Sequence, residues 1–258
     1  MILRAMPIRH LLFSLLLLAP TLVPAQEVEP TRHDLHDDLH VVQLTDAVWR
    51  FVSYQDQGGE WGRIPANGLI VVSGDTAALL DTPWTDEQTR LLFAWVESEL
   101  CAKIDAVVPT HSHGDCLGGL GAAHELGARS YGHEMTAEFA RRDGNPAPQT
   151  TFRDRLEVSV GEHRLELRHL GAGHTLDNVV VWIAQEKILF GGCLIKSAQT
   201  RHMGYVDEAD LEAWPETIAN VRTEYGDAVW IVPGHGSPGG ADTLRRTLEL
   251  IEEYRRSR

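Results

Sequence analysis

The chain has 258 residues, of which 43% are hydrophobic, and it carries a formal net charge of −14 at neutral pH. This length is sufficient for one domain with a substantial hydrophobic core. The acidic balance argues against nucleic acid or an anionic membrane surface as a partner, and an anionic small substrate would need positive charge supplied locally at its site.

Residues 1–25 have the composition of a signal peptide. Arg4 and Arg9 give a positively charged start, residues 11–19 are almost entirely apolar, and small residues stand before the predicted cut. A membrane anchor is the less favoured interpretation, because this run is shorter than the roughly 20 residues that span a bilayer. No later stretch is long and apolar enough to span one. We therefore predict a single domain over residues 26–258, exported to the periplasm.

The next segments predict a solvated terminus followed by a sheet. Residues 27–40 are acidic and rich in histidine, which favours a frayed end. Residues 41–54 and 67–81 alternate or run apolar and predict strands of one sheet. Residues 55–65 between them contain a Gly-Gly turn and predict a hairpin tip. Its aromatic residue Trp61 has two open interpretations, a flap over a substrate or a side chain packed back on the sheet.

A strand that ends at Asp81 is followed by a helix over residues 86–100. Thr85 and Gln88 form the pattern of a capping box at its start. Apolar residues at helical spacing predict that one face of this helix packs on the core. Cys101, directly after the helix, is expected to be a small core residue.

The loop over residues 110–121 carries the densest chemistry in the chain. It lies between a β-branched run at 104–108, which predicts a buried strand, and residues 117–126, which predict a helix. Four metal-binding side chain types lie within six residues: His111, His113, Asp115 and Cys116. In extended backbone the alternate residues project to one side, and the glycines between them permit tight turns. Imidazole and carboxylate groups suit Zn²⁺, so the loop predicts a metal site.

The second half of the chain repeats this order of strands, helices and strand-end loops. The expected elements are a loop at 141–149, a hairpin at 156–160 and 163–170, strands at 178–184, 187–190 and 228–232, and helices at 210–225 and 242–254. Three of its loops carry a further possible ligand beside glycine, namely His174, Cys193 and His235. Each of these alone is readily explained as a structural residue. The pattern of the two halves predicts two β-sheets back to back with helices outside.

Together the six candidate ligands resemble a known family. The signature H-x-H-x-D-x-x-G-G of the metallo-β-lactamase superfamily is matched by residues 111–119. The resemblance extends from about residue 38 to the C-terminus. It implies an α/β fold, a four-layer αβ/βα sandwich with metals at one edge of the sheets.

Two positions distinguish groups within the superfamily. Glyoxalase II, RNase Z and the third β-lactamase subclass place His after the signature Asp, where this chain has Cys116. The first two also supply a bridging Asp where this chain has Cys193, and the second subclass would have Asn at His111. Residues 81–84 and 193–196 are similar to the B1 subclass of metallo-β-lactamases.

The resemblance to the B1 subclass implies two zinc ions per chain. One zinc would be held by His111, His113 and His174, with a position left open for water, and the other by Asp115, Cys193 and His235. Because zinc lowers the pKa of bound water to about 7, the implied nucleophile is a zinc-bound hydroxide that attacks the β-lactam carbonyl. Asp115 and Lys196 are the expected catalytic side chains, with Lys196 binding the substrate carboxylate.

Two residues depart from the usual B1 pattern. Cys116 replaces an arginine, and we hypothesise that it is a neutral thiol behind the ligands; it could instead compete for zinc or pair with Cys193 when metal is absent. Tyr205 stands where many relatives have Asn, so its hydroxyl could contact the substrate or leave that role to zinc. Trp61 is the other candidate substrate-binding residue, and Asp81 is expected to orient a metal-bound histidine from behind.

The resulting hypothesis is a monomeric zinc β-lactamase that hydrolyses penicillins, cephalosporins and carbapenems and so confers antibiotic resistance. One alternative is another hydrolase of the same fold, a thioesterase or lactonase, with weak β-lactamase activity. A non-enzymatic alternative is a periplasmic zinc-binding protein with a closed site. Six ligands for two metals, with positions left open, argue against the last of these.

Overall fold

The structure is a computed structural model that describes residues 31–59 and 61–258. The predicted signal peptide lies outside the described residues. Among the residues that are described, no helix combines the length and the apolar character needed to cross a membrane.

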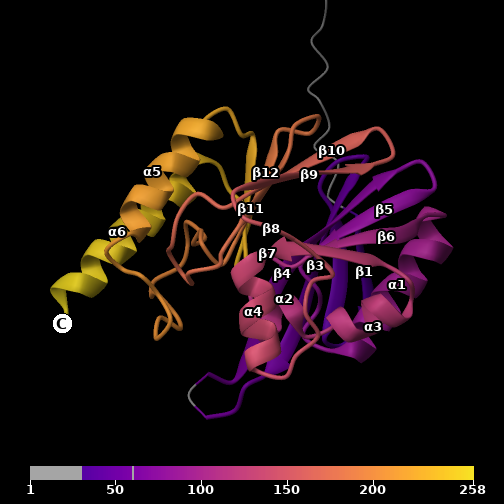
Figure 1. Cartoon of the computed structure of the whole chain (residues 1–258), viewed down its shortest axis with the longest axis horizontal. Coiled ribbons are helices and arrows are strands. Elements are labelled where there is room, and N and C mark those ends of the chain that lie inside the picture. Colours follow the sequence, from indigo (N-terminus) through magenta and orange to yellow (C-terminus); the bar gives the residue numbers. More distant parts are fainter. Residues whose placement is uncertain (1–30, 60) are drawn as a thin grey trace, which may run out of the picture.

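Two β-sheets form the centre of the molecule (Figure 1). The larger sheet has eight strands in chain order, antiparallel from β1 to β5 and parallel from β5 to β8. Its strands are β1 Arg32–His36, β2 Leu39–Gln43, β3 Val48–Asp56, β4 Arg63–Ser73, β5 Thr76–Leu80, β6 Lys103–Val108, β7 Arg129–His133 and β8 Thr150–Phe152. The smaller sheet has the order β13-β12-β11-β10-β9, and only β12 and β13 are parallel. Its strands are β9 Arg155–Val160, β10 His163–Arg168, β11 Val180–Ile183, β12 Ile188–Gly192 and β13 Trp230–Pro233.

Helices cover the outer face of each sheet (Figure 1). The helices on the side of the larger sheet are α1 Asp86–Leu100, α2 Gly114–Leu117, α3 Leu120–Glu125 and α4 Glu134–Arg142, and those on the smaller sheet are α5 Trp214–Glu224 and α6 Ala241–Arg256. The layers therefore run helix, sheet, sheet, helix, which confirms the predicted four-layer sandwich.

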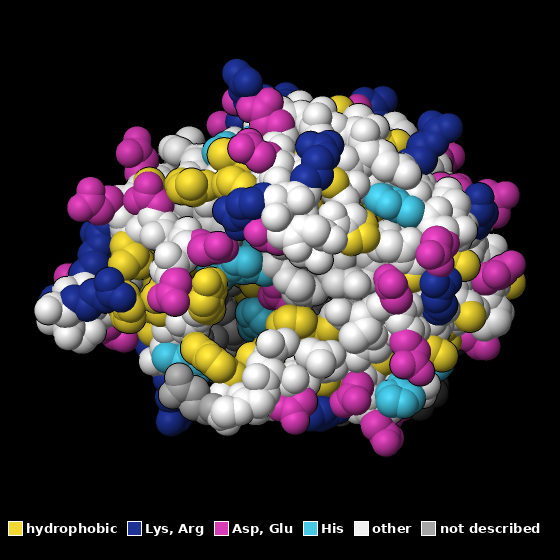
Figure 2. Space-filling model, turned by 60° about the horizontal axis from the view of Figure 1, so that its bottom comes forward, with side chains coloured by type: hydrophobic (Ala, Val, Ile, Leu, Met, Phe, Trp, Pro, Cys, Tyr) yellow, Lys and Arg dark blue, Asp and Glu magenta, His cyan; other side chains and the backbone are white. Residues whose placement is uncertain are grey.

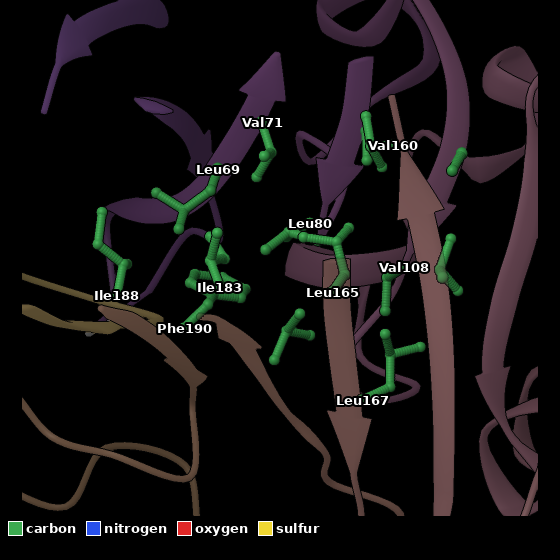
Figure 3. Close-up of a cluster of buried hydrophobic side chains, with 14 of the residues drawn as sticks. Leu69, Val71, Leu80, Val108, Val160, Leu165, Leu167, Ile183, Ile188 and Phe190 are labelled. Carbon is green, nitrogen blue, oxygen red and sulfur yellow. The ribbon is translucent and has the colours of Figure 1, made fainter. Parts of the chain in front are cut away.

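The main hydrophobic core lies between the two sheets (Figure 3). Leu69, Leu80 and Val108 come from the larger sheet, and Leu165 and Phe190 from the smaller one; all five are fully buried. Each side chain of this kind stabilises the fold by about 1.5–3 kcal/mol when it is buried. This packing fixes the two sheets against each other and so holds the loops at their shared edge in place.

Three expectations about the N-terminal half were wrong. The predicted strand at 41–54 is two strands, β2 and β3, because the Thr45 hydroxyl accepts the Val48 N–H at 3.1 Å and closes a turn. The strand predicted at 67–81 is likewise divided, at Gly74, whose φ is 64°. The expected frayed terminus contains β1, an edge strand paired with β2. The residues of β1 are mostly polar and partly exposed, so the sequence showed no hydrophobic pattern that would predict a strand there.

The helix ends also differ in detail from expectation. The Thr85 hydroxyl caps α1 by accepting the Gln88 N–H at 3.2 Å, whereas the Gln88 side-chain amide donates to the carbonyls of Asp38 and Tyr54 instead of completing a capping box. Cys101 is exposed rather than in the core, because it adopts φ 50° and ends α1 in the left-handed conformation. The helix predicted at 210–225 begins only at Trp214, with Pro215 in its first turn.

Candidate metal centre

All six predicted ligands lie together at one edge of the two sheets. His111, His113 and Asp115 follow β6 of the larger sheet, with Asp115 inside α2. The other three follow strands of the smaller sheet: His174 after β10, Cys193 after β12 and His235 after β13. Each sheet therefore contributes three donors to one centre.

The three imidazoles of the first predicted group converge. Nδ1 of His113 lies 3.0 Å from Nε2 of His111 and 3.2 Å from Nε2 of His174. Their rings meet edge to face, with centroids 4.6–5.1 Å apart. Bonds of 2.0–2.1 Å to a tetrahedral zinc would separate such nitrogens by about 3.3 Å. The two separations from His113 Nδ1 are therefore close to those expected of nitrogens that share one small ion.

The second predicted group is built around Asp115. Its Oδ2 lies 3.2 Å from Sγ of Cys193 and 3.1 Å from Nε2 of His235. Asp115 and Cys193 are both buried, and two acidic groups this close would be costly to ionise without a cation between them. Thiolate, carboxylate and imidazole together are a donor set that suits a transition metal such as zinc.

The protonation states around the centre also favour metal binding. Burial, followed by the charge of His113, lowers the pKa of His111, and burial together with Lys196 holds the pKa of His174 well below its usual value. Both rings are thus neutral and have a lone pair to give. The hydrogen bond from Cys116 holds the pKa of the Cys193 thiol well below its usual range. Metal ligands need these deprotonated forms.

His235 and Asp115 form an ion pair that a metal would replace. Burial disfavours the charged forms of both side chains, yet the hydrogen bond from His235 keeps the pKa of Asp115 well below its usual range. For His235, burial is outweighed by the Cys193 thiolate and the Asp115 carboxylate, which raise its pKa well above the ordinary value. A metal that takes His235 must therefore displace one proton.

Cys116 lies directly behind the first group. It is buried, and its Sγ is 3.2 Å from Nδ1 of His111 and 3.6 Å from the Thr110 hydroxyl. Burial, then the bond to Cys193, raises the pKa of the Cys116 thiol, which keeps it neutral. All three cysteines are free. Cys116 thus contacts His111 of the first group and Cys193 of the second.

Asp81 does not contact a ligand histidine, contrary to expectation. Its carboxylate accepts the Thr110 N–H at 2.6 Å and the Thr110 hydroxyl at 3.0 Å. Burial raises its pKa well above the ordinary value, and its backbone has φ 58°. Asp81 therefore holds Thr110, the residue before His111, and so fixes the start of the ligand loop.

The sequence did not predict two sets of contacts that hold His235 in place. Its Nδ1 donates to the Pro65 carbonyl at 2.6 Å, which leaves Nε2 to face the centre. The Asn67 amide bonds to the carbonyls of Pro233 and Gly236 at 2.8 and 2.7 Å, on either side of His235. These partners are about 170 positions away in the chain, so no local pattern indicates them.

The ligand loop is helical where extended backbone was expected. Asp115 lies in the short helix α2, because the N–H groups of Cys116 and Leu117 both donate to the His113 carbonyl. The glycines also have a different role from the one predicted. Gly118 and Gly119 do not adopt positive φ; a Cβ there would collide with the Trp84 carbonyl and the Thr89 hydroxyl. The signature glycines thus let α1 and its preceding turn approach the loop.

Gly118→Ala is therefore expected to lower the free energy of unfolding by about 3 kcal/mol, at the upper end of overpacking costs, because the atom in the way is backbone. Gly114→Ala is the matched control, since a Cβ on Gly114 would make only ordinary contact with the Trp84 ring at 3.9 Å. Urea unfolding of both variants measures the difference. Equal stability of the two would show that the close approach at Gly118 does not constrain the fold.

The centre opens into a cavity of roughly 1360 Å³. Figure 2 shows this hollow, with histidine side chains inside it and hydrophobic side chains around its mouth. Trp61 and Tyr205 line it and are 48% and 45% exposed, so Trp61 is not packed back on the sheet. Lys196 also lines it and is only 8% exposed, with its ammonium 5.4 Å from the Trp214 ring centroid. Glu208, which the sequence did not single out, lines the same cavity.

Comparisons with known proteins agree with this geometry. A family model described as the metallo-beta-lactamase superfamily matches residues 61–255. A metallo-beta-lactamase type 2 of Bacteroides fragilis is 40% identical over 93% of this chain and 96% of its own length. The enzyme of the same name from Bacillus cereus is 34% identical over 83% of each chain. The solved metallo-beta-lactamase of Pontibacter korlensis has a TM-score of 0.79 at 37% identity, covering 83% of this chain and 99% of that one.

Proposed function

The chain belongs to the metallo-β-lactamase superfamily, and from this premise we propose that it is a β-lactamase that uses two zinc ions. Its substrates would be penicillins, cephalosporins and carbapenems, whose β-lactam amide it hydrolyses, so that the host resists these antibiotics. We place it in the periplasm on the strength of the signal peptide predicted at residues 1–25. Its relatives of similar length are named for the same activity.

The observation that carries this proposal is the convergence of six metal-binding side chains, five of which line one cavity together with a buried lysine. Histidines 111, 113 and 174 would hold one zinc, and Asp115, Cys193 and His235 the other. Zinc bound there would supply a Lewis acid for the amide carbonyl and lower the pKa of coordinated water to about 7. The cavity side of the centre is open, which distinguishes a catalytic site from a closed structural one.

Asp115 would orient the attacking water. Its Oδ2 atom faces Cys193 and His235, whereas its Oδ1 atom points to the group of three histidines and lies 3.8 Å from Nε2 of His111. An oxygen between the two groups can therefore accept a hydrogen bond from water and hold it toward the substrate carbonyl.

Lys196 would bind the carboxylate of the substrate. It makes no ion pair with an acidic side chain in the described part of the chain, and its backbone N–H is fixed by the Thr247 hydroxyl at 2.8 Å. Burial lowers its pKa from the ordinary value, while the acidic groups of Cys193 and Asp115 oppose this. A cation in this partly desolvated position attracts an anion more strongly than a surface lysine does.

Two aromatic side chains frame the substrate from the cavity mouth. Tyr205 meets the His113 ring edge to face, at 5.4 Å between centroids, and its hydroxyl can donate to the opened amide. Trp61 at the tip of the β3–β4 hairpin would cover the apolar substituents of the substrate.

Hydrolysis of imipenem by the purified protein tests the proposal, followed by absorbance with and without EDTA and with zinc counted per chain. We expect rapid hydrolysis, close to two zincs, and loss of activity on chelation that added zinc restores. A penicillin and a cephalosporin are run in parallel to test the breadth of substrates.

The same assay separates the alternatives. Two zincs with turnover on thioesters or lactones that exceeds turnover on every β-lactam would favour another hydrolase of this fold. Two zincs with no turnover on any of these substrates would favour a zinc-binding protein. Activity with a single zinc would contradict the group of Asp115, Cys193 and His235.

A further inference from the structure

Glu208 lies in the segment between β12 and α5 and touches the metal centre from outside. We propose that Glu208 is a positioning residue for His113: it holds the ring so that Nδ1 faces the metal, and it ties the Tyr205 segment to the centre. This inference rests on the proposed zinc centre and adds a residue on which the affinity of that centre depends.

The contact itself is short and well directed. Oε2 of Glu208 lies 2.7 Å from Nε2 of His113. A neutral imidazole carries hydrogen on only one nitrogen, so a carboxylate at Nε2 fixes that hydrogen there and leaves the Nδ1 lone pair free. Nδ1 is the atom that lies near both His111 and His174. The contact thus selects the tautomer that the centre requires.

His113 needs such a partner more than His111 does. Its side chain is 22% exposed, compared with 1% for His111. The rear nitrogen of His111 faces Cys116, and that of His235 faces the Pro65 carbonyl. For His113, Glu208 is the one rear partner among the described residues. Without it, the ring could turn toward solvent.

Glu208 also joins segments that are distant in the sequence. Its other oxygen, Oε1, lies 3.8 Å from the guanidinium of Arg142 at the end of α4. Tyr205, three positions before Glu208, packs on the same His113 ring. The segment is held in turn by a bond from the Ala209 N–H to the Val206 carbonyl at 3.1 Å. A shift of Glu208 would therefore move a substrate-contacting residue as well as a ligand.

Glu208→Ala is expected to weaken zinc binding by about 10- to 100-fold, the range found when the outer partner of a ligand histidine is removed. Glu208→Gln keeps an acceptor without the charge, and Glu208→Asp keeps the charge on a shorter chain, so both should fall between wild type and alanine. Asp207→Asn is the matched control, because this neighbouring acid is exposed and makes no side-chain bond within the described residues. Competition with a chromophoric zinc chelator measures the affinities on the full-length folded protein.

Two further measurements distinguish positioning from a general loss of structure. In protein labelled with ¹⁵N-histidine, the Nε2–H signal of His113 should be protected in the zinc-loaded wild type and in Asp207→Asn, and exchange rapidly in Glu208→Ala. At saturating zinc, kcat of Glu208→Ala should recover toward wild type, and the loss that remains should be in KM, because the Tyr205 segment has moved. A structural defect would leave kcat low whatever the zinc concentration.

The outcomes separate this inference from the proposed function. Wild type that binds two zincs, with Glu208→Ala binding them within threefold as tightly, would overturn the role of Glu208 and leave the zinc centre intact. A wild type that binds no zinc would overturn both. An equal loss of affinity in Asp207→Asn would show an effect of net charge, and it would also overturn the role given to Glu208.

Discussion

Cys193→Ser is expected to remove close to one zinc per chain and to lower β-lactam hydrolysis by about 100-fold or more. This loss exceeds the roughly 10- to 100-fold effect typical of removing a residue that only hydrogen-bonds a metal ligand. The physical reason is that a serine hydroxyl does not ionise at neutral pH and is a poorer zinc ligand than the thiolate favoured at Cys193. The remaining donors of that group, Asp115 and His235, would then hold a metal by two bonds only. Zinc counting by mass spectrometry and turnover on imipenem measure the two effects.

Cys101→Ser is the control for this substitution, because Cys101 is exposed at the end of α1. It should retain two zincs and full turnover. A Cys193→Ser variant that also retains both would contradict the ligand role of Cys193, or show that Cys116 replaces it. Replacing both Cys116 and Cys193 separates these two explanations. If Cys116 takes over as a ligand in Cys193→Ser, the double variant should lose zinc. If Cys193 is not a ligand, the double variant should retain it.

Lys196→Ala is expected to raise KM for carboxylate-bearing β-lactams by about 10- to 100-fold, matching the roughly 1.5–3 kcal/mol of a hydrogen bond to a charged group. The zinc content should stay at the wild-type value, because Lys196 is not among the side chains of the donor groups. Steady-state kinetics and zinc counting on the same preparations measure both.

The controls for Lys196 separate charge from structure. Lys103→Ala removes an exposed lysine that pairs with Asp105 at 3.0 Å, and it should change nothing at the site. Lys196→Arg keeps the charge with a larger head group and should lose less affinity than alanine. Because Lys196 is buried, circular dichroism must first show that each variant is folded. An unchanged KM in folded Lys196→Ala would remove this residue from substrate binding.

The sequence indicated that the six candidate donors would meet, because all of them lie in glycine-containing loops that follow strands. A buried strand followed by a polar, glycine-rich loop is a local pattern, and the layered fold brings such loops to one edge. His111 and His174 are separated by 63 positions but become neighbours for this reason, their ring centroids 5.0 Å apart. The paired sheets and outer helices followed from the same alternation of elements.

What the sequence did not predict depends on contacts between distant segments. Glu208 is one acid among many in an acidic chain, and only the fold sets it against His113. The Pro65 carbonyl that orients His235 is backbone, which no residue type reveals. The role of Gly118 was misjudged for a related reason: the sequence shows that a side chain is missing, but not which neighbour needs the space.

The division of the donors between the two sheets has a consequence for how the protein is made. His111, His113 and Asp115 belong to the first sheet, while His174, Cys193 and His235 come from loops of the second. Domains and their parts are synthesised from the N-terminus onward, so an emerging chain that has completed only its first sheet presents an incomplete set. The last donor precedes only the final helix, α6. The donor set for the proposed zinc ions is therefore complete only in an almost finished chain, once the second sheet has docked on the first.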